Sequence, residues 1–214
     1  MRILKRPSSM IFAAPHGGFD LGTARIATMV CERVQWNCLI ARGYRTKTIP
    51  LNVNRPTEGV GLSPSQERHT SRAKTVYAEY AAKWRALNGP RATLYVELHG
   101  NSRVESAGRL EIAVVGMSKR ERDRVECVFR RGLARSAMDG LEVWVEGNRR
   151  IWYRARSTKR FGILGETPRA LHIEVPRRFR RSGTRAQTAS FLIDVLPQLE
   201  TLDDDVAMRR LQCH

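Results

Sequence analysis

The sequence has 214 residues, of which 42% are hydrophobic and 28% are charged, a balance that excludes a disordered chain and indicates a folded core. Its 38 lysines and arginines outnumber 21 acidic residues and give a formal net charge of +17. Such a charge attracts polyanions such as nucleic acid, acidic polymers or anionic membrane surfaces, although an arginine-biased composition with a solvated basic surface explains it equally well. A chain of this length commonly forms one domain, so we expect a single domain over residues 1–214.

The N-terminal segment and the cysteines bear on the location of the protein. The apolar run at residues 10–15 is too short for the core of a signal peptide, and no stretch approaches the roughly 18 apolar residues of a membrane span. We therefore expect a cytoplasmic protein with no membrane partner. Cys31, Cys38, Cys127 and Cys213 are scattered without a CxxC pair, which disfavours a thiolate zinc site. Because a chain of this size does not need disulfides, we expect all four to be structural filler.

The first half of the chain predicts two strands and two helices. Residues 9–15 are a short apolar run that ends in Gly-Gly, as in a buried strand that enters a loop. A helix follows, with Thr23 as its expected cap and an apolar stripe every four residues as far as position 34. A second strand is expected at 38–44, and residues 52–65 form a loop rich in Pro, Gly and Asn. The 3.6-residue period of residues 73–87 predicts the longest helix.

The second half alternates strands with helices. Helices are expected around residues 125–133 and 189–199. β-Branched residues and period-two alternation predict the strands, which are residues 92–98, 109–115, 141–146 and 170–175. The alternation indicates the α/β class, with a mixed, mostly parallel sheet and helices on both faces. In such folds the sites lie in loops at the carboxyl ends of the strands.

Three polar side chains stand where two of the predicted strands end. His16 and Asp20 follow the first strand in PHGGFDLGT, and His99 ends ATLYVELH. Two imidazoles and a carboxylate, with a fourth position left to water, are the ligands of a catalytic zinc site. The paired glycines let the backbone bring His16 and Asp20 to one point. The alternative is a plain turn in which Asp20 caps the following helix.

Further polar residues could complete an active site at the same edge. Alternation puts His172 and Glu174 on one face of a strand, and a buried carboxylate near zinc is a natural general base for a metal-bound water. The alternative is that Glu174 pairs with an arginine. Glu97 shares a strand face with His99 and could orient its imidazole. The loop residue Arg55 offers a fork suited to a carboxylate or a developing oxyanion.

These motifs, taken in order, carry a family resemblance. PHGG followed by an acidic residue, then N-x-N-R-P, A-x-x-V-Y-x-x-Y, E-L-H-G and I-E-V-P-R together resemble the N-formylglutamate amidohydrolase family over roughly residues 10–180. The HGG…D-x-G-T opening is similar to that of phage-type poly-γ-glutamate hydrolases, and both belong with the zinc carboxypeptidase-like (phosphorylase/hydrolase-like) fold.

The resemblance implies a set of roles. It implies zinc (Zn2+) ligands at His16, Asp20 and His99, a general base at Glu174, and a carboxylate-binding pair at Asn54 and Arg55. The sequence departs from the family at three positions, with Asp20 in place of a glutamate, and Asn52 and Glu97 in place of aspartates. These departures bear on the substrate more than on the metal.

The segment 149–162 mixes basic and aromatic residues, among them Trp152 and Tyr153. We interpret it as a loop beside the active site that draws in an acidic chain, with Tyr153 among the substrate-binding residues. The alternative is a groove for single-stranded nucleic acid, although no recognisable nucleic-acid module accompanies it.

The sequence therefore predicts a zinc-dependent amidohydrolase or carboxypeptidase-like hydrolase. Its substrate would be a small acidic or polyglutamate-like molecule, cleaved at an amide next to a carboxylate. The rival hypothesis is a basic nucleic-acid-binding protein on the same scaffold, with a vestigial metal site.

Overall fold

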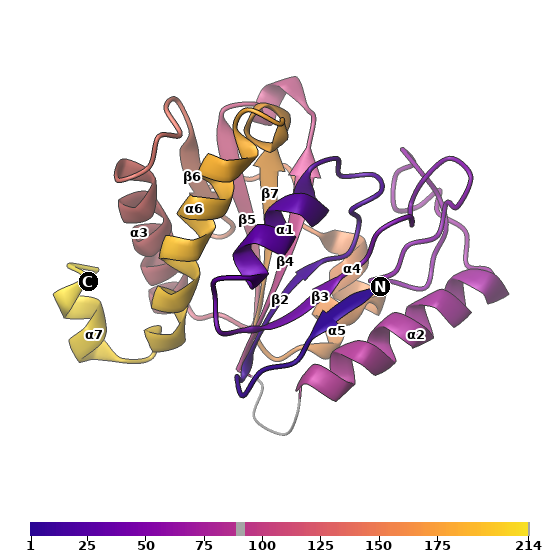
Figure 1. Ribbon diagram of the computed structural model, residues 1–214, viewed down its shortest axis with the longest axis horizontal. Helices are drawn as coiled ribbons and strands as arrows, with labels where there is room; N and C mark the ends of the chain where they lie inside the picture. The colour runs from indigo at the N-terminus through magenta and orange to yellow at the C-terminus, as the bar shows by residue number, and fades with distance from the viewer. Residues whose placement is uncertain (89–92, 214) are drawn as a thin grey trace.

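The computed structural model describes residues 1–88 and 93–213. Within them, seven strands form one sheet in the order β1-β3-β2-β4-β7-β5-β6 (Figure 1). The pairs β3–β2, β2–β4, β4–β7 and β5–β6 are parallel, whereas β1 runs antiparallel to β3 and β5 runs antiparallel to β7. This confirms the predicted mixed, mostly parallel α/β sheet. The strands are β1 Arg2–Leu4, β2 Met10–Ala14, β3 Asn37–Ile40, β4 Leu94–Asn101, β5 Arg109–Val115, β6 Glu142–Val145 and β7 Ala170–Pro176.

Helices cover both faces of the sheet, and Figure 1 shows α2 on the opposite side from α1 and α6. One face packs against α1, α3 and α6, and the other packs against α2 and α5. The helices are α1 Thr23–Cys31, α2 Ser71–Asn88, α3 Lys119–Ala134, α4 Arg156–Phe161, α5 Ile163–Glu166, α6 Arg185–Val195 and α7 Asp205–Arg210, with short 3-10 turns η1 Val104–Ser106, η2 Arg177–Arg180 and η3 Leu196–Thr201.

The central strands have no solvated face. In β2, Phe12 and Ala14 join the core under α1 and α6, while Ile11 and Ala13 join the core under α2. Because both sides of the strand are buried, the sequence is a continuous apolar run rather than an alternating one. This explains why a short apolar run before Gly-Gly predicted the strand.

The structure corrects several local expectations. β1 was not predicted, because three residues at a sheet edge carry too little pattern. β3 ends at Ile40, four residues before the predicted end. The segment 149–162 is not all loop, since it contains α4.

The predicted cap of α1 is also wrong. Gly22 stands at the N-cap with φ 95°, and the Thr23 hydroxyl donates instead to the carbonyl oxygen of Asp20 at 2.7 Å. A Cβ at position 22 would lie 2.3 Å from the carbonyl oxygen of Arg180, so both φ and space demand glycine there. The helix ends at Cys31, before the apolar stripe does.

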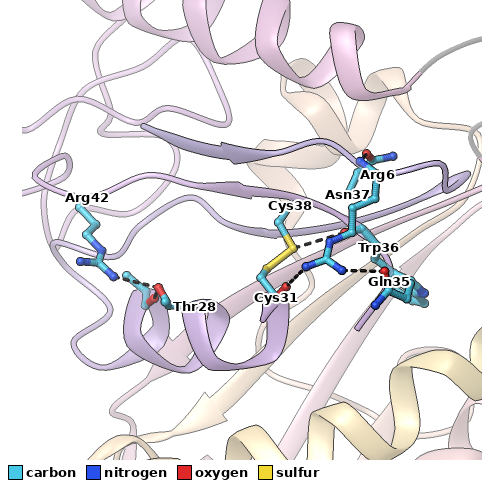
Figure 2. Close-up of a disulfide and its surroundings, with 9 residues drawn as sticks. Arg6, Thr28, Cys31, Gln35, Trp36, Asn37, Cys38 and Arg42 are labelled. Carbon is cyan, nitrogen blue, oxygen red and sulfur yellow. Dashed lines mark hydrogen bonds between the residues drawn. A yellow bond between two sulfur atoms is a disulfide. The ribbon is translucent and has the colours of Figure 1, made fainter. Parts of the chain in front are cut away.

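The four cysteines form two disulfides, contrary to the expectation that they are filler. Cys31–Cys38 joins the end of α1 to β3. Beside it, the Arg6 guanidinium donates to the carbonyl oxygen of Cys31 at 2.8 Å (Figure 2). Cys127–Cys213 ties the C-terminal segment to α3. Because disulfides persist in oxidising compartments and are rare in the cytosol, they weigh against the cytoplasmic location expected from the sequence.

Among the described residues, no helix is long and apolar enough to span a membrane.

Candidate metal centre and active-site cleft

The candidate site lies at the carboxyl ends of three neighbouring parallel strands, β2, β4 and β7. His16 follows β2, His99 lies in β4, and the register pairs His99 with Glu174 of β7. A Cβ at Gly17 would lie 2.7 Å from the carbonyl oxygen of Ala41, so only glycine lets the turn after His16 pass this close to the chain after β3. The sheet topology thus brings together residues that are far apart in the sequence.

His16, Asp20 and His99 meet as predicted. Asp20 Oδ2 lies 3.6 Å from His16 Nδ1 and 3.2 Å from His99 Nδ1. Ligand atoms at the corners of a tetrahedron with metal bonds of about 2.1 Å are about 3.4 Å apart. One ligand atom from each residue lies within 4.8 Å of the others, and all three residues are buried. The donor set and its spacing therefore fit a zinc ion.

The charges at this group also suit a cation. Burial opposes a charge on Asp20, but its contacts with His16 and His99 outweigh it and hold its pKa well below the usual value. Burial and the neighbouring Arg45 keep the pKa of His16 well below 6.5, which leaves a neutral imidazole. Burial lowers the pKa of His99, yet its contacts with Asp20 and Glu97 raise it to about 9. A divalent ion would replace the proton on His99.

Glu97 lies at the centre of a buried hydrogen-bond network. Its Oε2 is 2.9 Å from His99 Nε2 and 3.4 Å from His172 Nδ1. Tyr95 donates its hydroxyl to Oε1 at 2.9 Å, and Asn54 Nδ2 lies 3.1 Å from Oε2. By holding Nε2, the carboxylate turns the other nitrogen of His99 toward Asp20. This is the orienting contact that strand alternation predicted for Glu97.

One carboxylate oxygen of Glu174 has a hydrogen-bond partner and the other has none among the described residues. Its Oε1 lies 2.9 Å from His172 Nε2. The ring of His172 is itself stacked on that of His99, with centroids 3.9 Å apart. Over residues 1–88 and 93–213, Glu174 forms no ion pair with an arginine, and its buried Oε2 has no hydrogen-bond partner. The alternative interpretation, a Glu–Arg pair, is thus not observed.

The structure places Asn54 and Arg55 differently from the expected carboxylate-binding pair. Asn54 is buried and does not line the cleft, because its amide is directed to Glu97. Arg55 lines the cleft, but its fork is already engaged by Glu67, with Nε–Oε2 at 2.8 Å and Nη2–Oε1 at 2.5 Å. Arg55 thus meets a carboxylate of the protein itself.

Sequence reasoning missed Arg45, a cation that contacts one of the candidate metal ligands. Its Nη1 lies 3.1 Å from His16 Nδ1, and its guanidinium sits 4.6 Å from the centre of the Phe19 ring. Burial and the neighbouring Arg55 lower its pKa, and it forms no ion pair in the described part of the chain. Arg45 stands in the loop after β3 with no motif around it, so only its position at a strand's carboxyl end could have marked it.

These residues open into a cleft of about 1870 Å³ whose lining is rich in arginine. Tyr153 lines it as predicted, and burial together with the charge of Glu174 raises the pKa of Tyr153 to about 12. Some arginines elsewhere have acidic partners, as Arg72 has Glu58 at 2.5 Å and Arg135 has Asp194 at 2.7 Å. Most arginines of the cleft form no ion pair with any described residue: Arg45, Arg103, Arg109, Arg150, Arg154, Arg156, Arg177, Arg180, Arg181 and Arg185.

Comparison with known proteins gives a fold and no family. No protein-family model and no curated protein matches the sequence. Among solved structures, the gene product Atu2144 from Agrobacterium tumefaciens superposes with a TM-score of 0.56 at 14% identity, covering 93% of this chain and 92% of that one. A provisionally named carboxypeptidase A from Shewanella denitrificans also gives 0.56, at 11% identity over 94% of this chain. This chain spans only 60% of that protein.

At these identities the likeness shows the fold alone. It confirms the carboxypeptidase-like α/β architecture that the sequence predicted. It does not reach the N-formylglutamate amidohydrolase family, and it assigns no role to any residue.

Proposed function

We propose that this protein is a zinc-dependent hydrolase that cleaves an amide bond next to a carboxylate, related to the N-formylglutamate amidohydrolases. One observation carries the proposal. The group formed by His16, Asp20 and His99 shares its cleft with Glu174, whose Oε2 is buried and has no partner among the described residues. Metal ligands beside a free carboxylate oxygen are the parts that metal-assisted hydrolysis needs.

The chain's own residues divide the chemistry between them. A zinc ion, when bound, would lower the pKa of a water molecule and polarise the amide carbonyl. Glu174 takes the proton from the attacking water through Oε2, and the same carboxyl then delivers that proton to the leaving nitrogen. His172 keeps the carboxylate in place through its 2.9 Å contact with Oε1. Glu97 fixes both His99 and His172, so the metal ligand and the base are held by one group.

Arg45 is the residue best placed to meet negative charge on the substrate. It lines the cleft beside His16 and has no carboxylate partner in residues 1–88 or 93–213. We assign Arg45 the role of stabilising the oxyanion or binding the substrate carboxylate. Arg55 can serve the same end only in competition with Glu67, so it ranks second in this role.

The substrate class follows from the unpaired arginines. A single carboxylate would occupy one or two of them, whereas an acidic polymer such as a glutamate chain would occupy many. Because these arginines line the same cleft as the metal ligands and the base, we propose a polymer that is cut there. Arginine fields also hold nucleic acid, and this rival is an outcome of the test.

The test compares substrates with and without metal. The metal-free protein and the zinc-loaded protein are incubated with a γ-linked glutamate oligomer, with N-formylglutamate and with a single-stranded oligonucleotide. We expect release of amines from the oligomer only with zinc, and more slowly from N-formylglutamate. Glu79→Gln, an exposed change on α2 away from the cleft, serves as the control and keeps this activity. Salt-dependent oligonucleotide binding without any zinc-dependent hydrolysis would favour the nucleic-acid function instead.

A further inference from the structure

A second buried glutamate lies directly beside the proposed base. Glu111 of β5 and Glu174 of β7 are partners in the antiparallel register, and they are 0% and 6% exposed. Two carboxylates side by side in a core are costly unless each has hydrogen-bond donors. Glu174 is held by His172, and Glu111 is held by a different part of the chain.

Glu111 accepts hydrogen bonds from the backbone of a segment that lines the cleft. Its Oε2 accepts the backbone N–H groups of Trp152 and Tyr153, each at 2.9 Å. Residues 150–155 lie between β6 and α4 and form no helix or strand. Two consecutive N–H groups bound to one buried oxygen therefore fix the course of this segment where the sheet does not.

The fixed segment carries Trp152 and Tyr153. Together with Arg103 they form one wall of the cleft, which we call the aromatic wall. The Arg103 guanidinium lies 4.6 Å from the centre of the Trp152 ring and 6.0 Å from that of Tyr153. Trp152 is 53% exposed, although an indole is usually buried. All three residues line the cleft that also contains Glu174.

We propose that Glu111 is a positioning residue that fastens the aromatic wall to the strand pair carrying Glu174, and so sets the distance between a bound substrate chain and the base. The inference rests on the proposed function only in treating the wall as a substrate-binding surface. The hydrogen bonds that carry it are independent of any reaction.

For holding the two N–H groups, the acceptor oxygen of Glu111 matters more than its charge. Burial raises the pKa of Glu111 and the neighbouring Glu174 adds to this, while the two N–H groups oppose it. A neutral acceptor in the same position should therefore serve nearly as well. Glu111→Gln keeps one oxygen for both N–H groups, whereas Glu111→Ala removes it.

The first measurement is amide hydrogen exchange at positions 152 and 153, which needs no activity. We expect exchange roughly ten-fold or more faster in Glu111→Ala, because the two N–H groups lose their acceptor, and near-native exchange in Glu111→Gln. Glu126→Ala is the matched control, since it removes a carboxylate that accepts from Asn148 Nδ2 at the other end of the same connection. If Glu111→Ala does not fold, Glu111→Asp withdraws the oxygen by one methylene and takes its place.

The second measurement separates binding from turnover with the γ-linked glutamate oligomer. In Glu111→Ala we expect KM to rise roughly ten-fold or more with a smaller change in kcat and full zinc content, and we expect recovery in Glu111→Gln. Unchanged exchange at 152 and 153 in a folded Glu111→Ala protein would overturn the proposal, as would a Gln variant as impaired as the Ala variant. If the wild type neither binds nor cleaves the oligomer, the proposed function fails, and the exchange data alone decide whether Glu111 holds the wall.

Discussion

Glu97→Gln is the substitution that most severely tests the buried network. The carboxylate is 0% exposed and faces polar groups of four residues, Asn54, Tyr95, His99 and His172. The glutamine amide has a single acceptor oxygen, and its NH2 group would confront donors. The substitution therefore removes a charge and disrupts the hold on His99 Nε2.

The expected loss of metal affinity can be worked from the pKa of His99. Contacts with Asp20 and Glu97 raise this pKa from 6.5 to about 9 despite burial, which at about 1.4 kcal/mol per unit is about 3 kcal/mol. If Glu97 supplies about half, its loss costs roughly ten-fold in any interaction with a cation at His99. Orienting carboxylates behind a ligating histidine are typically worth about 10- to 100-fold in metal affinity. The two routes agree, so we expect a loss of about 10- to 100-fold.

The assay is a competition titration of zinc against a chromogenic chelator at pH 9, where proton competition at His99 is small, with urea unfolding of the same samples. Breaking the buried network should also lower the free energy of unfolding by about 3 kcal/mol. Glu58→Gln is the matched control, because Glu58 is a carboxylate of low exposure that is bound by Arg68 and Arg72 and does not line the cleft. It should lose stability and keep its zinc affinity.

Zinc affinity within about two-fold of wild type in a folded Glu97→Gln protein would refute this reasoning. If that variant fails to fold, Glu97→Asp keeps the charge but shortens the arm, and it should show an intermediate loss.

Four further outcomes are expected. Glu174→Gln should cut kcat roughly 100-fold or more at full zinc content; retained turnover would make Glu174 a structural residue. Arg45→Ala should lower kcat/KM by about 100-fold while leaving unfolding by urea nearly unchanged, because no carboxylate is left unpaired; an unaltered kcat/KM would remove Arg45 from the site. The pKa of His99 lies above its ordinary value, so the metal-free protein holds a proton on His99 at pH 7 and zinc binding should release about one proton. The zinc affinity should therefore rise with pH up to about pH 9 and then level off. Calorimetry in buffers of different ionisation enthalpy measures this release, and identical heats in all of them would contradict it. Replacing Cys127 and Cys213 together by serine should lower the free energy of unfolding by about 4 kcal/mol, given their separation of 86 residues, and an unchanged urea midpoint would show that the disulfide does not constrain the chain.

Much of the sheet could be predicted because its strands are buried on both faces. Met10–Ala14 is a short apolar run that is buried throughout, and Ala170–Pro176 is equally buried but alternates His172 and Glu174 on one face. Both patterns favour a core strand. Once the sheet is parallel, polar residues at the carboxyl ends of strands must gather at one edge, which brings His16 and His99 together. Period-two alternation then places Glu97 behind His99.

The rest depends on contacts that no local pattern records. Arg45 and Glu67 lie in irregular segments, and only the folded chain shows that one faces His16 while the other occupies the fork of Arg55. Asn54 matched a family motif, yet burial directs its amide inward to Glu97. The pairing of Cys127 with Cys213 joins residues 86 positions apart, and spacing alone cannot reveal such a partner.

The central claim is that His16, Asp20 and His99 together hold one zinc ion. X-ray data collected on either side of the zinc absorption edge, from crystals of the zinc-loaded protein, test it most directly. We predict a single anomalous peak about 2.1 Å from a nitrogen of each histidine and an oxygen of Asp20. A peak instead among Glu97, His99 and His172, the other group that could ligate an ion, or no peak within reach of His16, would contradict the account.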